Sequence, residues 1–589
     1  MKVVLTTLNA KYIHTALALR YLKEYVKADF PDIEICEYTI KDVPSRIVAD
    51  LYTRQPAVVG FSIYIWNVEE TIPLIQMLKK VLPSTKIVLG GPEVSYDTKH
   101  WMERIPEADC IVQGEGELPF RAVLHAIESG TSFTAIPGIA CRDGNRIVIN
   151  KTEDKVDLNT VPSPYGVDED LSLLRDRVVY YETSRGCPFS CQFCLSSIES
   201  GVRYFPIERV KSDLIRLMEA GVRTIKFVDR TFNLKRDYAV ELFQFLIDHR
   251  KETVFQFEIT GDILHPQTVE YLTTHVPTGL FRFEIGVQST NDITNSLVKR
   301  RQNFERLKSN ILRLKEAGNI VLHLDLIAGL PEEDYASFQK TFDDVFAFQP
   351  DELQLGFLKM LRGTGLRLAA DSFGYIYMDH APYEIFSNRV LSYDDVLRIK
   401  QVEDVLEKYW NEDKLKHTTR FLTTQVYESP FEFFQVFGTY WEENGWSRIG
   451  HQLEDLFIRL DGFLKTTLRT QGSYETARSY MICDFLMQHR IRPHKVWWDR
   501  DLHRKDRAQA LSEVYLHPER FGEAYQNLNL TKEILEKHTV IERIPVLVDL
   551  DNPSRKPELV PGWVLCYYPP GLPKGEKPYL FTAPAQSLA

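Results

Sequence analysis

Three of the chain's eight cysteines lie close together in TSRGCPFSCQFC, at the spacing C-x3-C-x2-C. They are Cys187, Cys191 and Cys194. On a [4Fe–4S] cluster, three thiolates would leave one iron open to a small molecule. A zinc site would instead need a fourth protein ligand nearby. No His or Cys follows within thirty residues of Cys194, so the spacing favours the iron–sulfur cluster.

The cysteines directly follow the first of six predicted strands that alternate with helical stretches. The stretches Ile207–Ala220 and Asn303–Ala317, for example, carry apolar residues at helical spacing. Six strand–helix units predict a partial (β/α)6 barrel over residues 176–375, with chemistry at the carboxyl ends of its strands. The predicted strands are Val178–Glu182, Thr224–Val228, Val254–Ile259, Phe281–Val287, Val321–Ile327 and Glu352–Phe357.

The cysteine motif after the first strand of such a barrel resembles the radical S-adenosylmethionine (SAM) superfamily. Phe193 is the aromatic residue often found before the last cysteine. The resemblance implies that Cys187, Cys191 and Cys194 are catalytic and hold a [4Fe–4S] cluster whose open iron binds SAM. It also implies reductive cleavage of SAM to methionine and a 5′-deoxyadenosyl radical, with an electron donor such as flavodoxin or ferredoxin.

Two later motifs resemble the subgroup that contains oxygen-independent coproporphyrinogen oxidase. They are Glu284–Ser289 (EIGVQS) and Asp325–Pro331 (DLIAGLP). The resemblance implies that Glu258 and Asp325 hold the ribose hydroxyls of SAM, because carboxylates accept hydrogen bonds from hydroxyls. It implies that Gln288 and Arg300 hold the methionyl carboxylate, with Glu284 in the same cofactor site. The continuation EITGD departs from the subgroup, and a solvated charge is the alternative for Glu258.

Residues 1–130 form an earlier series of strands and helices. Near-continuous apolar strands, such as Ala57–Ser62 and Lys86–Gly90, predict a doubly wound, Rossmann-like parallel sheet. Ligands on such sheets bind at the carboxyl ends of the strands. Small residues gather at these predicted ends: Ser62; Gly90, Gly91 and Pro92; and Gly114, Glu115, Gly116 and Glu117.

A parallel sheet in front of a radical SAM barrel resembles the B12-dependent radical SAM family, whose first domain binds cobalamin. Corrinoid-binding domains carry D-x-H-x-x-G, then S-x-L, then G-G. Ser62-Ile63-Tyr64 and Gly90-Gly91 match the last two parts, and the GEGE sequence that starts at Gly114 matches a further hallmark. The resemblance implies a cobalamin site made by Asn9, Tyr12, Ser62, Tyr64, Gly90, Gly91, Pro92, Gly114, Glu115 and Gly116.

The first part of the corrinoid motif is missing. His14 lies three residues before the expected histidine position, so an ordinary loop histidine is favoured over a cobalt ligand. The loop Thr7–Ile13 is expected to face the lower side of the corrin, with Asn9 and Tyr12 nearest to cobalt. A vestigial first domain and a nucleotide-binding sheet are alternatives. No G-x-G-x-x-G follows the first strand and no G-x-x-x-x-G-K-[ST] occurs, which disfavours a nucleotide.

Two further regions complete the expected organisation. Residues 131–175 are expected to be a connector with short strands, and residues 376–589 a mostly helical domain with a small terminal β element in IPVLVDL, GWVLCYY and YLFTA. This domain resembles one of unknown function that is attached to a subset of these enzymes. Its basic segment Gln488–Arg507 contains Trp497 and Trp498 and could bind RNA or an anionic substrate. The net charge of −11 favours a charged helix face with packed indoles instead.

The composition is that of an ordinary globular protein, with 44% hydrophobic and 26% charged residues. No apolar run reaches the length of about 18 residues that spans a membrane, so we expect no membrane partner. The start MKVVLTTLNAKYIHT predicts a first core strand and not a signal peptide. Clustered cysteines with a metal or catalytic role predict a cytoplasmic location, where thiols stay reduced.

Together, the resemblances imply a cobalamin-dependent radical SAM methyltransferase that methylates an unactivated carbon with methylcobalamin and the 5′-deoxyadenosyl radical. A cobalamin-assisted rearrangement or cyclisation is the main alternative. RNA methylthiolation is disfavoured because the first domain offers only Cys36 and Cys110, and a corrinoid sensor is disfavoured because the cluster motif is intact. The substrate is expected to be a small molecule or a peptide rather than RNA, and the motifs do not name it.

Overall fold

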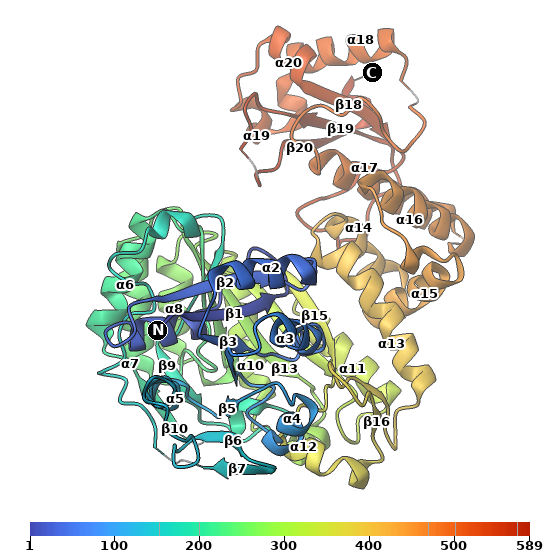
Figure 1. Cartoon of the computed structure of the whole chain (residues 1–589). Helices are drawn as coiled ribbons and strands as arrows, with labels where there is room; N and C mark the ends of the chain where they lie inside the picture. The colour runs from blue at the N-terminus through green and yellow to red at the C-terminus, as the bar shows by residue number, and fades with distance from the viewer. Residues whose placement is uncertain (152–153, 199–200, 469, 501, 574, 589) are drawn as a thin grey trace. The chain divides into compact units, whose positions relative to one another are not determined.

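The computed structural model describes residues 1–151, 154–198, 201–468, 470–500, 502–573 and 575–588. The chain forms two compact units (Figure 1). Unit 1 comprises Met1–Phe338, Phe348–Pro350 and Gly356–Tyr393, and unit 2 comprises Gln339–Ala347, Asp351–Leu355 and Asp394–Ala589. Both predicted strand–helix series therefore lie in unit 1, except for residues 339–347 and 351–355, which belong to unit 2.

The first part of unit 1 is a seven-stranded sheet in the order β2-β1-β3-β4-β5-β6-β7. The first five strands pair in parallel, whereas β6 and β7 pair antiparallel. The strands expected in a separate connector therefore extend the first sheet, and the boundary expected at residue 130 falls inside it. The bounds are β1 Val3–Asn9, β2 Ile33–Thr39, β3 Val58–Ser62, β4 Lys86–Gly90, β5 Cys110–Val112, β6 Ile139–Asp143 and β7 Arg146–Asn150.

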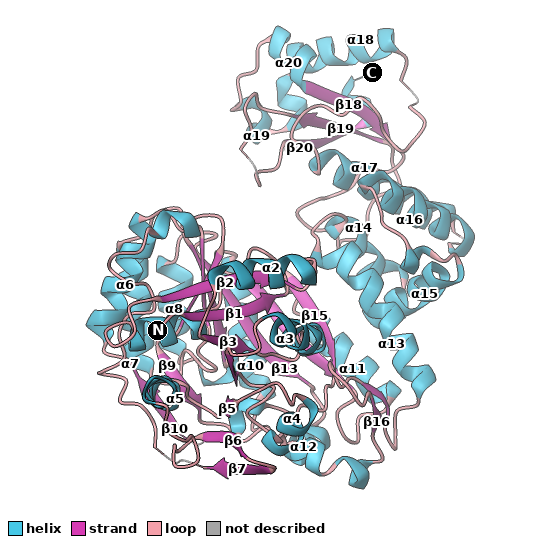
Figure 2. Cartoon of the chain, viewed as in Figure 1, coloured by secondary structure: helices cyan, strands magenta, loops and turns pink. Residues whose placement is uncertain are grey.

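Helices cover both faces of this sheet (Figure 2). One hydrophobic cluster contains Leu19 and Leu124, and the other contains Leu51, Ile75 and Trp101, on helices of the opposite face. Because β3 and β4 are buried on both sides, their sequences are continuously apolar. The predicted doubly wound arrangement is confirmed. The helices are α1 Leu17–Val26, α2 Pro44–Arg54, α3 Val68–Val81, α4 Thr98–Arg104 and α5 Glu117–Ser129.

A second sheet has six strands in the order β15-β14-β13-β12-β11-β8, and its strands from β8 to β14 pair in parallel. The prediction of six successive strand–helix units is confirmed. The strands are β8 Val178–Tyr181, β11 Thr224–Phe227, β12 Val254–Ile259, β13 Phe281–Gln288, β14 Val321–Ala328 and β15 Glu352–Phe357. The helices are α6 Ile207–Glu219, α7 Arg236–Asp248, α8 Pro266–His275, α9 Asp292–Leu297, α10 Phe304–Ala317 and α11 Tyr335–Phe346.

Side chains alternate strictly along these strands. In β12, β13 and β14, every second residue is fully buried against the helices, and the others are only partly buried and face the barrel interior. The buried face is rich in phenylalanine: the Phe257 ring lies 4.7 Å from that of Phe227 and 4.6 Å from that of Phe232. This aromatic packing holds the barrel strands and frees their inner faces for polar residues.

A short antiparallel hairpin, not predicted from the sequence, interrupts the strand–helix alternation after β8. It consists of β9 Ser184–Cys187 and β10 Gly201–Tyr204, and its first strand ends at Cys187. The rest of unit 1 adds α12 Gly365–Leu368 and the pair β16 Ile376–Tyr377 and β17 Ile385–Ser387.

Unit 2 is mostly helical and ends in a three-stranded antiparallel sheet. Its helices are α13 Tyr393–Leu406, α14 Lys416–Phe421, α15 Pro430–Glu443, α16 Leu453–Thr467, α17 Gln471–Met487, α18 Arg504–Leu516, α19 Glu523–Gln526 and α20 Lys532–His538. Its strands are β18 Thr539–Ile544, β19 Gly562–Tyr567 and β20 Tyr579–Pro584. The predicted small β element is confirmed in GWVLCYY and YLFTA, which hold β19 and β20. Its first strand was placed too late, because β18 ends at Ile544, the first residue of IPVLVDL.

The basic segment Gln488–Arg507 is helical only from the start of α18, so the predicted charged helix face is wrong for most of it. The predicted packing of its indoles is confirmed. Trp498 is 7% exposed, with its ring 5.5 Å from that of Phe485, and Trp497 stacks on Phe457. Such burial leaves the Trp498 ring no free face on which a base could stack.

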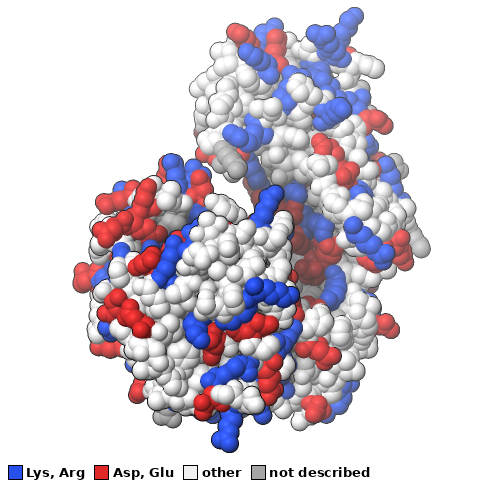
Figure 3. All heavy atoms as spheres, viewed as in Figure 1, with Lys and Arg blue, Asp and Glu red and all other residues white. Residues whose placement is uncertain are grey.

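No helix of the described residues is long and apolar enough to cross a membrane. Acidic and basic side chains are interspersed over the visible face of unit 1 (Figure 3). A face with mixed signs lacks the continuous basic stripe that nucleic-acid-coating proteins use.

We expect Phe257→Ala to destabilise unit 1 by about 3–5 kcal/mol, because it removes a fully buried ring and leaves a cavity between strands and helices. The urea midpoint of unfolding, followed by far-ultraviolet circular dichroism, measures the change. Leu368→Ala removes an apolar side chain that is 84% exposed and should stay within about 0.5 kcal/mol of the wild type. Equal losses from the two variants would contradict this account of the barrel core.

Candidate active site

Cys187 is the last residue of β9, and Cys191 and Cys194 lie in the loop that follows it. Ser197 Oγ donates to the carbonyl oxygens of Cys191 and Cys194, at 2.7 and 2.6 Å, and so holds the turn of the loop. Burial raises the pKa of Cys187 and Cys191, and the charge of Cys194 raises both further. The thiols therefore lie within one another's electrostatic field, as ligands of a common centre must. Phe193 packs against the hydrophobic cluster of the first sheet.

Gln288 and Arg300 lie beside the cysteine loop. Gln288 ends β13 with a left-handed backbone, at φ 69°, and its side-chain Oε1 is buried without a partner among the described residues. Arg300 donates through Nη2 to the Gly286 carbonyl, and its nearby charge opposes the rise that burial causes in the pKa of the Cys191 thiol. A buried acceptor without a partner costs free energy unless a ligand satisfies it. The side chains of Gln288 and Arg300 lie close together, since a Cβ added at Gly286 would collide with Gln288 Nε2 and would be 3.8 Å from Arg300 Nη2.

Glu258 and Asp325 both face the barrel interior. Burial raises the pKa of Glu258, whose carboxylate lies 3.8 Å from the Arg230 guanidinium. Asp325 Oδ1 lies 2.9 Å from His323 Nε2. The charges of Asp325 and Glu284 add to the rise in the pKa of Glu258, so the three predicted carboxylates share one electrostatic environment.

Glu284 has a partner that the motif did not reveal. Lys226 Nζ donates to both of its carboxylate oxygens, at 2.9 and 2.7 Å. Glu284 therefore has its charge balanced by the neighbouring strand β11. Lys226 could have been recognised from the sequence, because it lies at an inward-facing position of a strand whose alternate residues are apolar.

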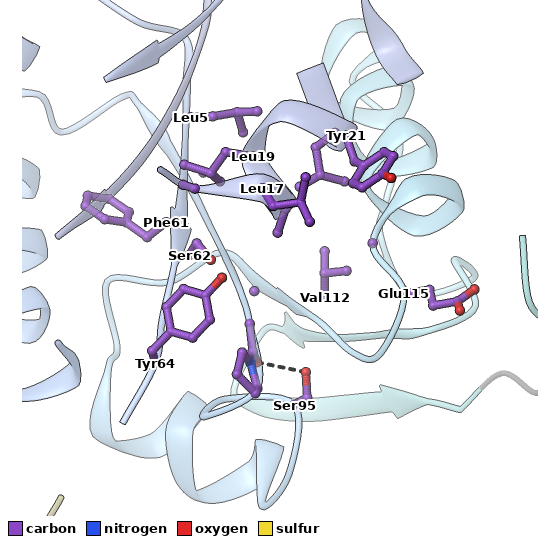
Figure 4. Close-up of a pocket in the computed structure, with 18 of the residues that line it drawn as sticks. Leu5, Leu17, Leu19, Tyr21, Phe61, Ser62, Tyr64, Ser95, Val112 and Glu115 are labelled. Atoms are coloured by element: carbon purple, nitrogen blue, oxygen red, sulfur yellow. Dashed lines mark hydrogen bonds between the residues drawn. The ribbon is translucent and has the colours of Figure 1, made fainter. Parts of the chain in front are cut away.

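A cavity of about 710 Å³ lies at the carboxyl ends of the first sheet (Figure 4). Apolar side chains such as Leu5, Leu17 and Val112 border it, with Tyr64 and Glu115 among its polar residues. Nine of the ten residues predicted for cobalamin line it: Asn9, Ser62, Tyr64, Gly90, Gly91, Pro92, Gly114, Glu115 and Gly116. The barrel contributes Tyr180, Glu182, Arg185, Leu195, Val228 and Arg230.

Two contacts hold residues that line the cavity. The Ser95 hydroxyl donates to the Gly91 carbonyl oxygen at 2.9 Å (Figure 4). The Tyr64 ring stacks on Trp66, with 4.3 Å between the ring centroids. A Cβ added at Gly90 would have Val112 as its nearest neighbour, at 3.9 Å, so this position is open toward the cavity.

The placement of Tyr12 near the cavity is wrong. Its side chain is 75% exposed, and its ring lies under the Arg177 guanidinium, 4.7 Å away. The expected loop also begins later, because β1 continues to Asn9. Asn9 Nδ2 donates to the His14 carbonyl oxygen at 3.1 Å. Side chains alternate in direction along a strand, so the continuation of β1 from Thr7 to Asn9 changes the direction in which the residues after it point.

His14 lines the cavity and is held by the barrel. Its Nδ1 lies 2.9 Å from Tyr180 Oη, and burial lowers its pKa. Its backbone also pairs with Val178 of β8. The expectation of an ordinary loop histidine rests on the missing motif, and no contact here tests it.

Three family models match this chain. One described as B12 binding domain matches residues 3–124, and one described as Radical SAM superfamily matches residues 181–345. The third, described as Protein of unknown function (DUF4080), matches residues 371–565. The chain therefore carries a B12-binding domain followed by a radical SAM domain. The B12-binding match and nearly all of the radical SAM match lie in unit 1.

Two curated relatives and one solved structure illustrate the likeness. The cobalamin-dependent radical SAM methyltransferase TokK of Streptomyces tokunonensis is 28% identical over 305 residues, 48% of this chain and 44% of TokK. The anaerobic magnesium-protoporphyrin IX monomethyl ester cyclase of Rubrivivax gelatinosus is 24% identical over 346 residues, 56% of this chain and 62% of the cyclase. The chain thus spans about half the length of the curated relatives it matches.

The structure of the cobalamin-dependent SAM radical enzyme OxsB, with aqua-cobalamin bound, aligns at a TM-score of 0.56 and 15% identity. The alignment covers 82% of this chain and 79% of OxsB. At this identity the likeness shows that the chain shares the OxsB fold, and the predicted fold class is confirmed.

A pH-dependent stability should arise from Glu182, which borders the cavity and follows β8. Burial raises the pKa of Glu182 from 4.5 to about 7, although Arg185 donates to it at 2.8 Å. The folded protein keeps a proton that the unfolded chain releases, so stability falls as pH rises through this window and levels off above it. We expect Glu182→Gln to reduce this fall, measured by urea unfolding between about pH 5 and pH 8. Parallel pH profiles of wild type and variant would contradict the assignment.

Proposed function

We propose that this protein is a cobalamin-dependent radical SAM enzyme that transfers a methyl group to an unactivated carbon. The observation that carries the proposal is the single cavity bordered by residues of both domains. Its floor is the carboxyl end of the B12-binding sheet, and Leu195, which directly follows Cys194, is part of its wall. A corrinoid on the sheet and a cluster on the cysteines would therefore serve one substrate position.

The residues present fit the three implied groups. Cys187, Cys191 and Cys194 supply the thiol donors of a cluster with one open iron. The unpartnered Oε1 of Gln288 and the Arg300 guanidinium suit the amino and carboxylate groups of SAM. The apolar walls of the cavity and the open position at Gly90 suit a corrinoid.

When bound, the cluster supplies the electron that cleaves SAM, and cobalamin supplies the methyl group. The chain's own residues bind and orient these groups. Gln288 and Arg300 would fix the methionyl end of SAM beside Cys191, while Glu258 and Asp325 would accept hydrogen bonds from its ribose hydroxyls. The apolar residues of the cavity would exclude water from the reacting groups.

The methyltransferase named TokK supports methyl transfer. The cyclase of Rubrivivax gelatinosus supports the alternative, a cyclisation or rearrangement without methyl transfer. A mass gain of one methyl group in the product distinguishes these two activities.

The wider setting is also proposed. We infer a cytoplasmic protein that receives electrons from a donor such as flavodoxin or ferredoxin, and a small-molecule or peptide substrate. All eight cysteines, which lie in the described residues, are free thiols, in keeping with a reducing compartment. We also propose residues 176–375 as the barrel domain and residues 376–589 as the carboxyl-terminal domain.

The deciding experiment uses full-length protein purified anaerobically from cells supplied with cobalamin, with iron and sulfide reconstituted. We expect about one corrinoid and about four iron atoms per chain. With SAM and a strong reductant, it should form 5′-deoxyadenosine and S-adenosylhomocysteine. Cys191→Ala should lose the 5′-deoxyadenosine while it keeps the corrinoid. Deoxyadenosine from a wild type that binds no corrinoid would mean that the first domain is vestigial.

The floor of the cavity can be tested separately with Gly90→Val, which should weaken hydroxocobalamin binding at least tenfold. The added side chain would project toward the cavity, where nothing but Val112 lies within 4 Å of an added Cβ among the described residues. Gly450→Val is the matched control, because an added Cβ there meets no described atom within 4 Å and unit 2 lacks the cavity. Unchanged affinity in Gly90→Val would place the corrinoid elsewhere.

A further inference from the structure

Four charged side chains join the B12-binding sheet to the hairpin that carries Cys187. Glu115 and Glu117 follow β5, whereas Arg185 and Arg203 lie on β9 and β10. Arg185 Nη2 donates to Glu117 Oε1 at 2.7 Å. Arg203 Nη2 donates to Glu115 Oε1, which also lies 3.9 Å from Arg185 Nη1. We call these four residues the clasp.

The two arginines lie side by side and need countercharge, which Glu115 and Glu117 supply in addition to Glu182, the acceptor of Arg185 Nε at 2.8 Å. Arg185 and Arg203 are direct partners across the antiparallel pair, and like charges in that position destabilise a hairpin. Arg185 is only 14% exposed, so water screens its charge poorly. Glu115 lies near both guanidiniums, and Glu117 neutralises Arg185 from the other side. The GEGE sequence therefore supplies the countercharge for a hairpin of the other domain.

The hairpin links the position of Arg185 to that of Cys187 in the predicted cluster site. Cys187 is two residues from Arg185 and pairs with Gly201 across the strands. Between them, Gly186 has φ 100°, and an added Cβ would collide with the Gly201 carbonyl oxygen. The Arg185 guanidinium is also packed 5.2 Å from the Tyr21 ring and 5.5 Å from the Phe205 ring. A displacement of Arg185 would therefore displace Cys187.

Three residues of the clasp also line the cavity, together with Tyr21, which contacts Arg185. Glu115, Glu117, Arg185 and Tyr21 all line it. A group that fills the cavity would restrict the carboxylates, and a cluster on Cys187 would restrict the arginines. Binding of either group would therefore reduce the conformational entropy that is lost when the other group binds.

We propose that the clasp couples corrinoid binding to cluster binding, and that Glu115 and Glu117 are positioning residues for the Cys187 hairpin rather than corrinoid ligands. The inference rests on the proposed function, since it needs both groups to bind. Coupling between two sites is reciprocal. The cluster should therefore tighten corrinoid binding by the same factor by which the corrinoid tightens cluster binding.

The test measures the dissociation constant of hydroxocobalamin for the full chain, by quenching of tryptophan fluorescence, with and without the reconstituted cluster. We expect the wild type to bind at least about five-fold more tightly when the cluster is present. In the double variant Glu115→Gln, Glu117→Gln the ratio of the two affinities should fall below about two-fold. Arg121 lies on α5, the helix that begins at Glu117, and forms an ion pair with Asp29. Arg121→Gln removes this ion pair and should keep the wild-type ratio.

Arg203→Gln provides a second test that leaves both carboxylates in place and should also reduce the ratio. It decides the matter if circular dichroism shows that the double variant does not fold. A wild-type ratio of one, or an unchanged ratio in the clasp variants, overturns the coupling. Equal weakening with and without the cluster would make the glutamates corrinoid ligands and would also overturn it. A wild type that binds no hydroxocobalamin overturns the proposed function instead.

Discussion

Hydrogen bonds between the loop after β1 and the start of β8 hold the two sheets of unit 1 against each other. The Val178 amide donates to the Ile13 carbonyl oxygen at 2.7 Å, and the Thr15 hydroxyl donates to the Val178 carbonyl oxygen at 3.0 Å. Both sheets bind ligands at the carboxyl ends of their strands. These bonds fix the start of β8 beside the loop after β1, and residues of both sheets border one cavity.

The electrostatics of the barrel follow from this arrangement. An interior with several carboxylates is stable only when cations balance them or when protons are retained. Lys226 balances Glu284, and Arg230 lies near Glu258, whose pKa burial still raises. The barrel thus keeps a set of acceptors that lie close together and are only partly neutralised. Such a set suits hydroxyl and ammonium groups of a ligand better than it suits an anion.

The sequence predicted those parts of the fold that local patterns determine. The six barrel strands were predicted within one or two residues, because their alternation or apolar runs arise from burial at each position. The hairpin of β9 and β10 was missed, since its stability depends on Glu115 and Glu117, about seventy residues earlier in the chain. The same reason explains why β6 was placed in a connector: its pairing with β5 lies across α5 and is not visible locally.

Site residues divide in the same way. The cysteines, Gln288 and Arg300 belong to motifs with fixed spacing, and the structure places them side by side. Lys226 has no motif and is recognisable only once its strand is known to face the interior. Tyr12 was misplaced because β1 continues to Asn9 and alters the direction of the residues that follow.

The two glycines of the hairpin, Gly186 and Gly201, differ in their freedom to change in evolution. Gly201 has φ 86°, and an added Cβ there meets no described atom within 4 Å. Asparagine, which tolerates a left-handed backbone better than most residues, could replace it at modest cost. Gly186 has both a left-handed backbone and a carbonyl oxygen in the place of its missing Cβ. Drift at position 186 would therefore require a second change that moves β10, so the strand beside Cys187 can diverge only through paired substitutions.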